Sequence, residues 1–128
     1  MTVQLNHTIV WSSDRTRSAR FLAEMLGRPA PSKVGHFDVV ELDNRVALDF
    51  ADADGPIHQQ HYAFLISEEE FDAVLRRIRD RGLPHWADPM RKRPGAINEN
   101  DGGRGVYFIG PDDHLLEVIT RPYGGGVT

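Results

Sequence analysis

The sequence predicts an α+β fold in which a strand–helix–strands order occurs twice, over about residues 1–55 and 56–128. Two segments have apolar residues at the three- and four-residue spacing of an amphipathic helix, and each follows a segment rich in β-forming residues. A pair of short β-rich segments then follows each helix. The length of 128 residues and the hydrophobic fraction of 40% fit one globular domain, residues 1–128, that contains both halves.

The first half begins with a predicted strand over residues 5–11, LNHTIVW, which are rich in β-forming types. Three residues capable of capping a helix follow, and the last of them is Asp14. Apolar residues recur at helical spacing through residues 15–26, and Gly27 ends the pattern. We therefore expect an amphipathic helix over residues 15–26.

The rest of the first half is a predicted β-hairpin. Residues 36–42 and 45–50 are short runs of β-forming residues. The dipeptide Asp43-Asn44 lies between them, and both residue types are common in tight turns.

The second half repeats this order. Residues 61–66, HYAFLI, form a predicted strand, and Ser67 after it can cap a helix. Glu70 lies three residues further on, which completes the capping-box pattern. The helix that follows is expected to stop at Gly82.

Residues 105–109 and 114–120 form the last two predicted strands, and a long loop over residues 84–104 precedes them. Loops of about 20 residues are uncommon in compact domains and are usually functional or disordered. We expect a mobile lid here, with a rigid surface loop packed through Trp86 and Met90 as the alternative.

Composition excludes several classes of function. The chain has no cysteine, so any metal must be held by His, Asp or Glu. A net charge of −4 argues against nucleic acid as the main partner, because phosphate binding needs clustered basic residues. No segment has the run of roughly 20 apolar residues that would span a bilayer. These features predict a cytoplasmic protein with no membrane or nucleic-acid partner.

Three polar residues lie in predicted strands among apolar neighbours of the same face. His7 shares its face with Leu5 and Ile9 by strand alternation, and His61 and Glu117 interrupt apolar rows in the same way. A polar group on an apolar face must be hydrogen-bonded, paired or metal-bound. Two imidazoles and one carboxylate are a standard ligand set for a divalent first-row metal.

The segments LNHTIVW, HYAFLI and GVYFIGPDDHLLEVIT together resemble the vicinal oxygen chelate superfamily, which includes glyoxalase I, bleomycin- and fosfomycin-resistance proteins and extradiol dioxygenases. The resemblance covers almost the whole chain. Its most specific part is the last segment, which is close to Tyr-Phe-x-Asp-Pro-Asp-Gly-His-x-x-Glu. Gly110 replaces the first Asp of that pattern here, and Asp113 replaces its Gly.

The resemblance implies tandem βαβββ modules that form a curled mixed sheet around a metal cavity, and a homodimer that completes each site. It also implies that His7, His61 and Glu117 bind a divalent ion, and it leaves Fe, Zn, Mn and Ni open as its identity. Asp49 falls where glyoxalase I has a fourth ligand, so it is either a ligand or a hydrogen-bonded or arginine-paired carboxylate.

The resemblance further implies a metal-dependent enzyme whose small substrate chelates the ion through vicinal oxygens. Glyoxalase-like lyase or isomerase chemistry and dioxygenation both remain open, with Glu117 and Tyr107 as catalytic residues. The alternative is a drug-resistance protein that sequesters bleomycin or modifies fosfomycin. The expected substrate-binding residues are Trp11, Arg93, Asn98 and Arg104.

Overall fold

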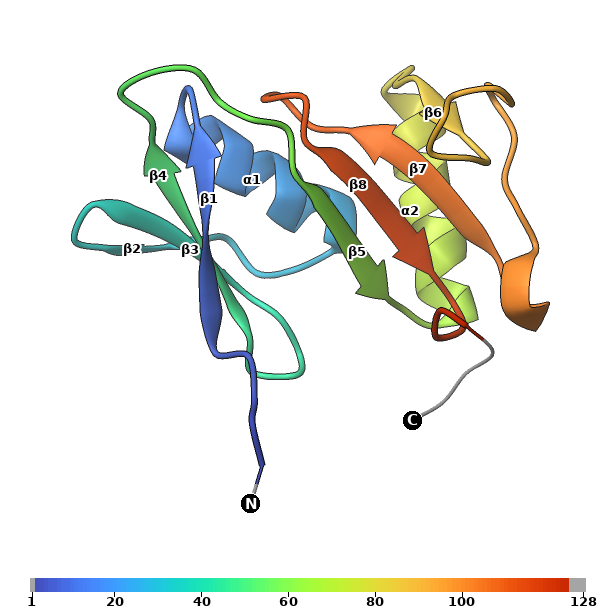
Figure 1. Ribbon diagram of the computed structural model, residues 1–128, viewed down its shortest axis with the longest axis horizontal. Helices are drawn as coiled ribbons and strands as arrows, with labels where there is room; N and C mark the ends of the chain where they lie inside the picture. Colours follow the sequence, from blue (N-terminus) through green and yellow to red (C-terminus); the bar gives the residue numbers. More distant parts are fainter. Residues whose placement is uncertain (1, 125–128) are drawn as a thin grey trace. The chain divides into compact units, whose positions relative to one another are not determined.

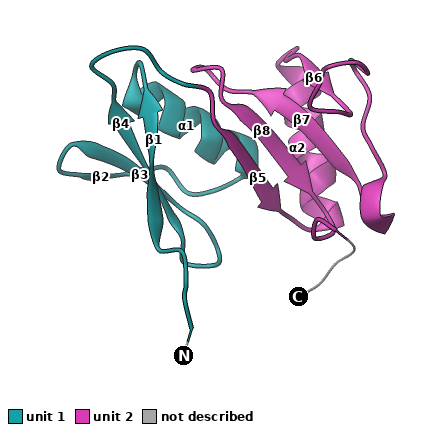
Figure 2. Cartoon of the chain, viewed as in Figure 1, with its two compact units in different colours: residues 1–58 teal, residues 59–128 magenta. Residues whose placement is uncertain are grey.

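The computed structural model describes residues 2–124, which form two compact units, residues 2–58 and 59–124 (Figure 2). Each unit contains one helix and one four-stranded mixed sheet, in the order strand, helix, three strands (Figure 1). This confirms the expectation of an α+β fold made of tandem βαβββ modules. Within the described residues neither sheet closes on itself.

Unit 1 comprises β1 (His7–Ser12), α1 (Arg15–Leu26), β2 (Ser32–Val34), β3 (Phe37–Glu41) and β4 (Ala47–Asp52). The strand order is β1-β4-β3-β2, with β1 and β4 parallel and the other neighbours antiparallel. The predicted helix cap is confirmed, because the Asp14 carboxylate accepts a hydrogen bond from the N–H of Arg17 at 3.1 Å. Gly27 ends the helix at φ 67°, a conformation that favours glycine.

Unit 2 comprises β5 (His61–Leu65), α2 (Glu68–Asp80), β6 (His85–Trp86), the short 3₁₀ helix η1 (Asn100–Gly102), β7 (Gly105–Ile109) and β8 (Leu115–Ile119). The strand order β5-β8-β7-β6 matches that of unit 1, and β5 and β8 are again parallel. The capping box at Ser67 and Glu70 is confirmed by hydrogen bonds in both directions.

The helix of each unit covers one face of its sheet. In unit 2, Phe64, Phe108 and Val118 point to the covered face and are at most 8% exposed. They belong to the same core as Phe71 and Ile78 of α2, which are fully buried. Burying each such side chain contributes roughly 1.5–3 kcal/mol. No helix among the described residues of unit 2 covers the opposite sheet face, which carries His61 and Glu117.

Two predicted strand boundaries were wrong, because residues with positive φ extend the turns. Arg45 has φ 64°, and its N–H donates to the carbonyl of Leu42 at 3.1 Å, so β4 begins at Ala47 rather than at Arg45. Asp113 has φ 64° and closes the turn before β8 through a 3.0 Å hydrogen bond to the carbonyl of Gly110. Arginine gives no sequence signal for this conformation.

The short strands β2 and β6 were also missed. They span three and two residues, too few for an alternating pattern to be read. Within the described part of the chain, no helix has the length and apolar character required to cross a bilayer.

Candidate metal and substrate site

His61 and Glu117 lie next to each other on the open face of the sheet in unit 2. His61 is the first residue of β5, and Glu117 is paired in register with Ala63, two residues further along that strand. The parallel register brings the two side chains together, and Nε2 of His61 is 3.0 Å from Oε1 of Glu117. The His61 side chain is 46% exposed and that of Glu117 13%, so both are accessible from one side.

This spacing suits two ligands of one ion. Ligand atoms at about 2.1 Å from a metal and at right angles to each other are separated by roughly 3 Å. A neutral imidazole nitrogen and a carboxylate oxygen are also donors that divalent first-row metals accept. Within residues 2–124 no group of three or more His, Asp or Glu side chains is placed to hold a metal ion.

The start of β5 is fixed by His114, in the turn before β8. The backbone N–H of Gln60 donates a hydrogen bond to Nδ1 of His114 at 3.0 Å, and the N–H of Leu115 donates to the carbonyl of Gln60 at 2.9 Å. Nδ1 is thus an acceptor, which places the proton of the neutral ring on Nε2. His114 is 6% exposed and therefore acts as a hydrogen-bonding residue that holds the chain just before His61.

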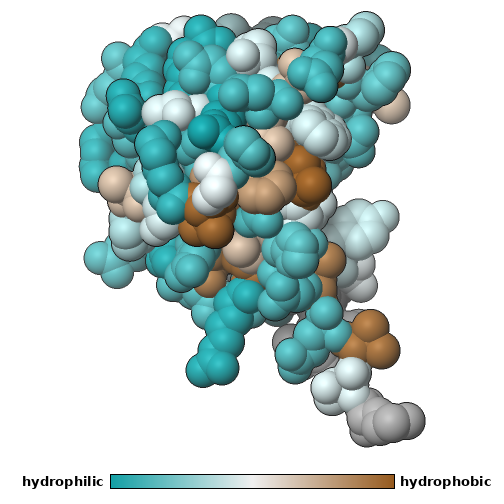
Figure 3. Space-filling model, turned by 90° about the vertical axis from the view of Figure 1, so that its left-hand side faces the viewer, coloured by the Kyte–Doolittle hydropathy of each residue, from teal (hydrophilic) through white to brown (hydrophobic). Residues whose placement is uncertain are grey.

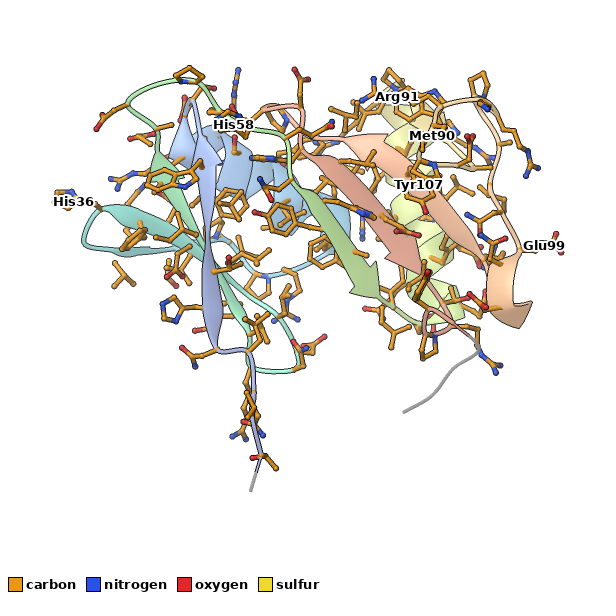
Figure 4. All side chains as sticks on the ribbon, viewed as in Figure 1. His36, His58, Met90, Arg91, Glu99 and Tyr107 are labelled. Atoms are coloured by element: carbon orange, nitrogen blue, oxygen red, sulfur yellow. The ribbon has the colours of Figure 1, made fainter. Side chains whose placement is uncertain are left out.

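Tyr107 lies on β7, on the side of Glu117 opposite to β5 and His61. It pairs with Glu117 in the antiparallel register of β7 and β8, and its ring centroid is 5.9 Å from that of His61. Figure 4 shows its side chain over β7 beside β8. Burial, the charge of Glu117 and the hydrogen bond with that carboxylate raise the pKa of Tyr107 to about 12. At neutral pH the phenol is protonated and donates to Glu117.

Unit 1 repeats this placement of a histidine and an acid. His7 opens β1 as His61 opens β5, and Asp49 is paired with Ile9, two residues further along β1. Asp49 therefore has the same register relation to His7 that Glu117 has to His61. The side-chain partner of His7 is Asn6, whose Oδ1 is 2.7 Å from Nδ1 of the imidazole.

A cavity of about 490 Å³ opens over the His61–Glu117 pair. Its walls come from β5, β7, β8, η1 and the segment after β8, all in unit 2. The lining residues are His61, Ala63, Asn98, Asn100, Asp101, Arg104, Tyr107, Glu117, Ile119, Arg121 and Tyr123.

Arg104, expected to bind substrate, lines this cavity but already has anionic partners. Its guanidinium contacts the carboxylates of Glu68 and Asp72, each at 2.8 Å, and lies 4.5 Å from the ring centroid of Phe71. These contacts attach the start of β7 to α2. The hydroxyl of Thr120 and Arg104 lower the pKa of Glu68 by hydrogen bonding to its carboxylate.

Asn98 also lines the cavity, but its amide holds the chain in place. Its Nδ2 donates to the carbonyl of Ala87 at 2.8 Å, and its Oδ1 accepts from the N–H of Asn100 at 3.2 Å. The other two expected substrate contacts are not among the cavity lining. Trp11 is 49% exposed on the open face of unit 1, and Arg93 lies in the loop after β6.

The segment predicted as a mobile lid is hydrogen-bonded internally. The Asp88 carboxylate accepts the N–H groups of Lys92 and Arg93 at 2.8–3.0 Å, and the N–H of Ala87 donates to the carbonyl of Arg93 at 3.1 Å. The guanidinium of Arg91 stacks 5.0 Å from the centre of the Trp86 ring. Met90 is 75% exposed, so the packing expected of it is absent. Figure 4 shows Met90 and Arg91 together in this loop.

Arg121 lines the cavity but is not among the substrate-binding residues expected from the sequence. It lies four residues after Glu117, so continued strand alternation would place it on the same face, as it does Ile119. The strand predicted over residues 114–120 stops one residue before Arg121, so the prediction did not place Arg121 on the face of Glu117. Figure 4 shows His36 at the β2–β3 turn and His58 in the segment between β4 and β5, both in unit 1.

Residues 4–118 match the model of the glyoxalase/bleomycin resistance protein/dioxygenase superfamily. Among curated proteins, the glutathione transferase FosA of Serratia marcescens is 28% identical over 124 residues, which cover 92% of this chain and 81% of FosA.

Two solved structures resemble the chain over almost its full length. The structure of oxidase ChaP-H1 has 60% sequence identity and a TM-score of 0.95, and covers 97% of this chain and 100% of its own. The structure of oxidase ChaP-H2 has 57% sequence identity and a TM-score of 0.95, and the match covers 98% of this chain and 100% of ChaP-H2. FosX of Mesorhizobium loti shares the fold. Its structure has 20% sequence identity and a TM-score of 0.70, and the match covers 96% of each chain.

Proposed function

The chain belongs to the glyoxalase/bleomycin resistance protein/dioxygenase superfamily, and from this we propose that it is a metal-dependent oxidase of a small substrate with two adjacent oxygen atoms. The observation that carries the proposal is the His61–Glu117 pair, 3.0 Å apart at the base of an open cavity. The high identity to two proteins named oxidases favours oxidation over glyoxalase-like isomerisation.

In this proposal His61 and Glu117 are ligands of a divalent ion, and His7 is the third. Asp49 is a further candidate because its register relation to His7 matches that of Glu117 to His61. FosX of Listeria monocytogenes, which shares the fold, was crystallised with Mn(II). When bound, such an ion polarises the oxygens of a chelating substrate and, if it is redox-active, exchanges electrons with it.

The protein's own residues orient the site around that ion. Tyr107 acts as a hydrogen-bond donor rather than as a base, because its pKa of about 12 keeps the phenol protonated at neutral pH. Its hydrogen bond holds the Glu117 carboxylate in position, as partners of ligands do in metal sites. Ala63 and Ile119, also in the cavity wall, give a substrate an apolar surface to lie on.

Metal analysis of single variants tests the ligand assignment. His61→Ala, Glu117→Ala and His7→Ala should each lose most of the bound Fe(II), measured by metal content after gel filtration. His36→Ala is the matched control, because His36 lies at the β2–β3 turn, and it should retain the metal. Equal metal content in all four variants and the wild type would show that the ligands are wrong.

Oxygen uptake by the Fe(II)-loaded protein tests the reaction class, with 4-nitrocatechol as a probe that offers two adjacent oxygens. Chelation should change the absorption spectrum of the probe in the wild type and not in His61→Ala. If a panel of catechols and hydroxyquinones neither changes in spectrum nor supports oxygen uptake, the oxidase proposal is wrong.

A second candidate function is thiol transfer to fosfomycin, favoured by the 28% identity to FosA over 81% of that protein. Consumption of glutathione in the presence of fosfomycin and Mn(II) would identify this activity. Sequestration of bleomycin without chemistry is the remaining alternative, and it predicts drug binding that the metal-ligand variants leave unchanged. We further propose that the working unit is a homodimer in the cytoplasm.

A further inference from the structure

We propose that Arg121 is the anion-binding residue of the cavity in unit 2, and that the substrate carries a carboxylate on an aromatic or similarly flat body. The proposal deepens the proposed function, since it names a feature of the substrate of the same site. It rests on the charges and the shape of the cavity wall, and no metal is needed for Arg121 to bind a carboxylate.

Two arginines line the cavity, and they differ in what they contact. Arg104 is held by Glu68 and Asp72, so its one positive charge is already paired with two carboxylates. Among the described residues, Arg121 has no carboxylate within 4.0 Å, and its side chain is exposed to the cavity. A guanidinium presents two parallel N–H donors that match the two oxygens of a carboxylate.

The backbone beside Arg121 is shaped to leave its side chain room. A Cβ atom at Gly103 would lie 2.5 Å from Cγ of Arg121 and 2.5 Å from Oγ1 of Thr120. Only glycine therefore lets the aliphatic part of Arg121 pack against the loop after η1. That hydroxyl of Thr120 is itself fixed, because it accepts the N–H of Arg104 at 2.8 Å.

The rest of the lining indicates what kind of anion fits. Asp101 and Glu117 are acidic, so the cavity favours a group with one negative charge over a doubly charged phosphate. Ile119 and Tyr123 are also in the wall and offer apolar surface to a flat ring. Arg121 follows Ile119 by two residues and Glu117 by four, which places the anion contact beyond the metal-ligand pair along the direction of β8.

The test compares benzoate with benzamide, which has the same shape and no charge. Both are titrated into the full-length ¹⁵N-labelled chain, once metal-free and once with Zn²⁺, and amide shifts near Gly103 and Tyr123 report binding. Benzoate should bind the wild type at least about fivefold more tightly than benzamide, because an ionic hydrogen bond is stronger than a neutral one.

Arg121→Gln should remove that preference, and Arg121→Lys should keep part of it, since lysine retains the charge without the paired donors. Arg93→Gln is the matched control, because Arg93 does not line the cavity, and it should bind as the wild type does. Equal binding of benzoate to the wild type and Arg121→Gln, or no preference in the wild type, overturns the proposal.

The two proposals fail separately. Loss of the benzoate preference in a protein that still binds metal through His61 and Glu117 contradicts only the role of Arg121. Normal benzoate binding in a protein whose metal content does not depend on those ligands contradicts only the metal-dependent function.

Discussion

Tyr107 shows how one residue combines packing and polarity at the site. Its side chain is only 9% exposed, yet its phenol contacts a carboxylate that is itself a candidate ligand. Burial disfavours the phenolate, and the negative charge of Glu117 disfavours it further. The Tyr107 phenol therefore stays neutral and holds the Glu117 carboxylate by a hydrogen bond, without adding a second negative charge that could attract a cation.

Titration of the tyrosines tests this at the residue scale. In the metal-free protein one phenol should ionise near pH 12 by absorbance at 295 nm, and Tyr107→Phe should remove that step. Because the folded pKa lies above the unfolded value of about 10, the associated stability is complete below pH 10 and is lost as the pH rises through 12. Burial also raises the pKa of Tyr62, so Tyr62→Phe is the control and should leave the step near pH 12 in place.

At the scale of elements, the Asp88 side chain stabilises the conformation of the loop after β6. The Asp88 carboxylate accepts two backbone N–H groups, from Lys92 and Arg93, and those hydrogen bonds lower its pKa. This arrangement is what a rigid surface loop requires, and it favours that alternative over the mobile lid for residues 88–93.

Asp88→Ala should release this loop and leave the sheet intact. We expect faster hydrogen exchange at the amides of Lys92 and Arg93 and a small loss of stability, since the hydrogen bonds from both amides to the Asp88 carboxylate are removed. Asp54→Ala, in the loop after β4, is the control. If the Lys92 and Arg93 amides exchange at the maximal unprotected rate already in the wild type, the loop is mobile after all.

At the scale of the whole molecule, the described helix of each unit covers one face of its own sheet, and apolar side chains are exposed on the other face. Ile9 and Trp11 of β1 are 39% and 49% exposed, and Leu65 of β5 is 60% exposed. The side of the molecule seen in Figure 3 shows apolar side chains among the polar ones at the surface. Neighbouring exposed apolar side chains, such as Ile9 and Trp11 on one face of β1, are candidates for a protein–protein contact.

The proposed homodimer predicts that a charge on the uncovered sheet face of unit 2 weakens self-association. Leu65→Glu should raise the dimer dissociation constant at least about tenfold in sedimentation experiments, because burying an unpaired carboxylate is costly. Val34→Glu, on the exposed strand β2, is a matched change that should have little effect. A wild-type chain that sediments as a monomer at micromolar concentration with its metal bound would rule out the dimer as the working unit.

The sequence by itself determined the two helices, their caps and the repeated order of elements, because apolar spacing and capping are local properties. It also placed His61 and Glu117 on apolar strand faces, since alternation depends only on position in a strand. The short strands β2 and β6 and the turns at Arg45 and Asp113 carry no such local signal.

Only the tertiary structure decided which of these residues contact one another. The register of β5 against β8 brings Glu117 within 3.0 Å of His61, and no pattern along the chain fixes a register between strands about 50 residues apart. Likewise, the sequence does not distinguish the roles of the two arginines Arg104 and Arg121. Only the packing shows that α2 supplies carboxylate partners to Arg104 and not to Arg121. Long-range contacts, rather than residue types, thus separate a structural arginine from one available to a ligand.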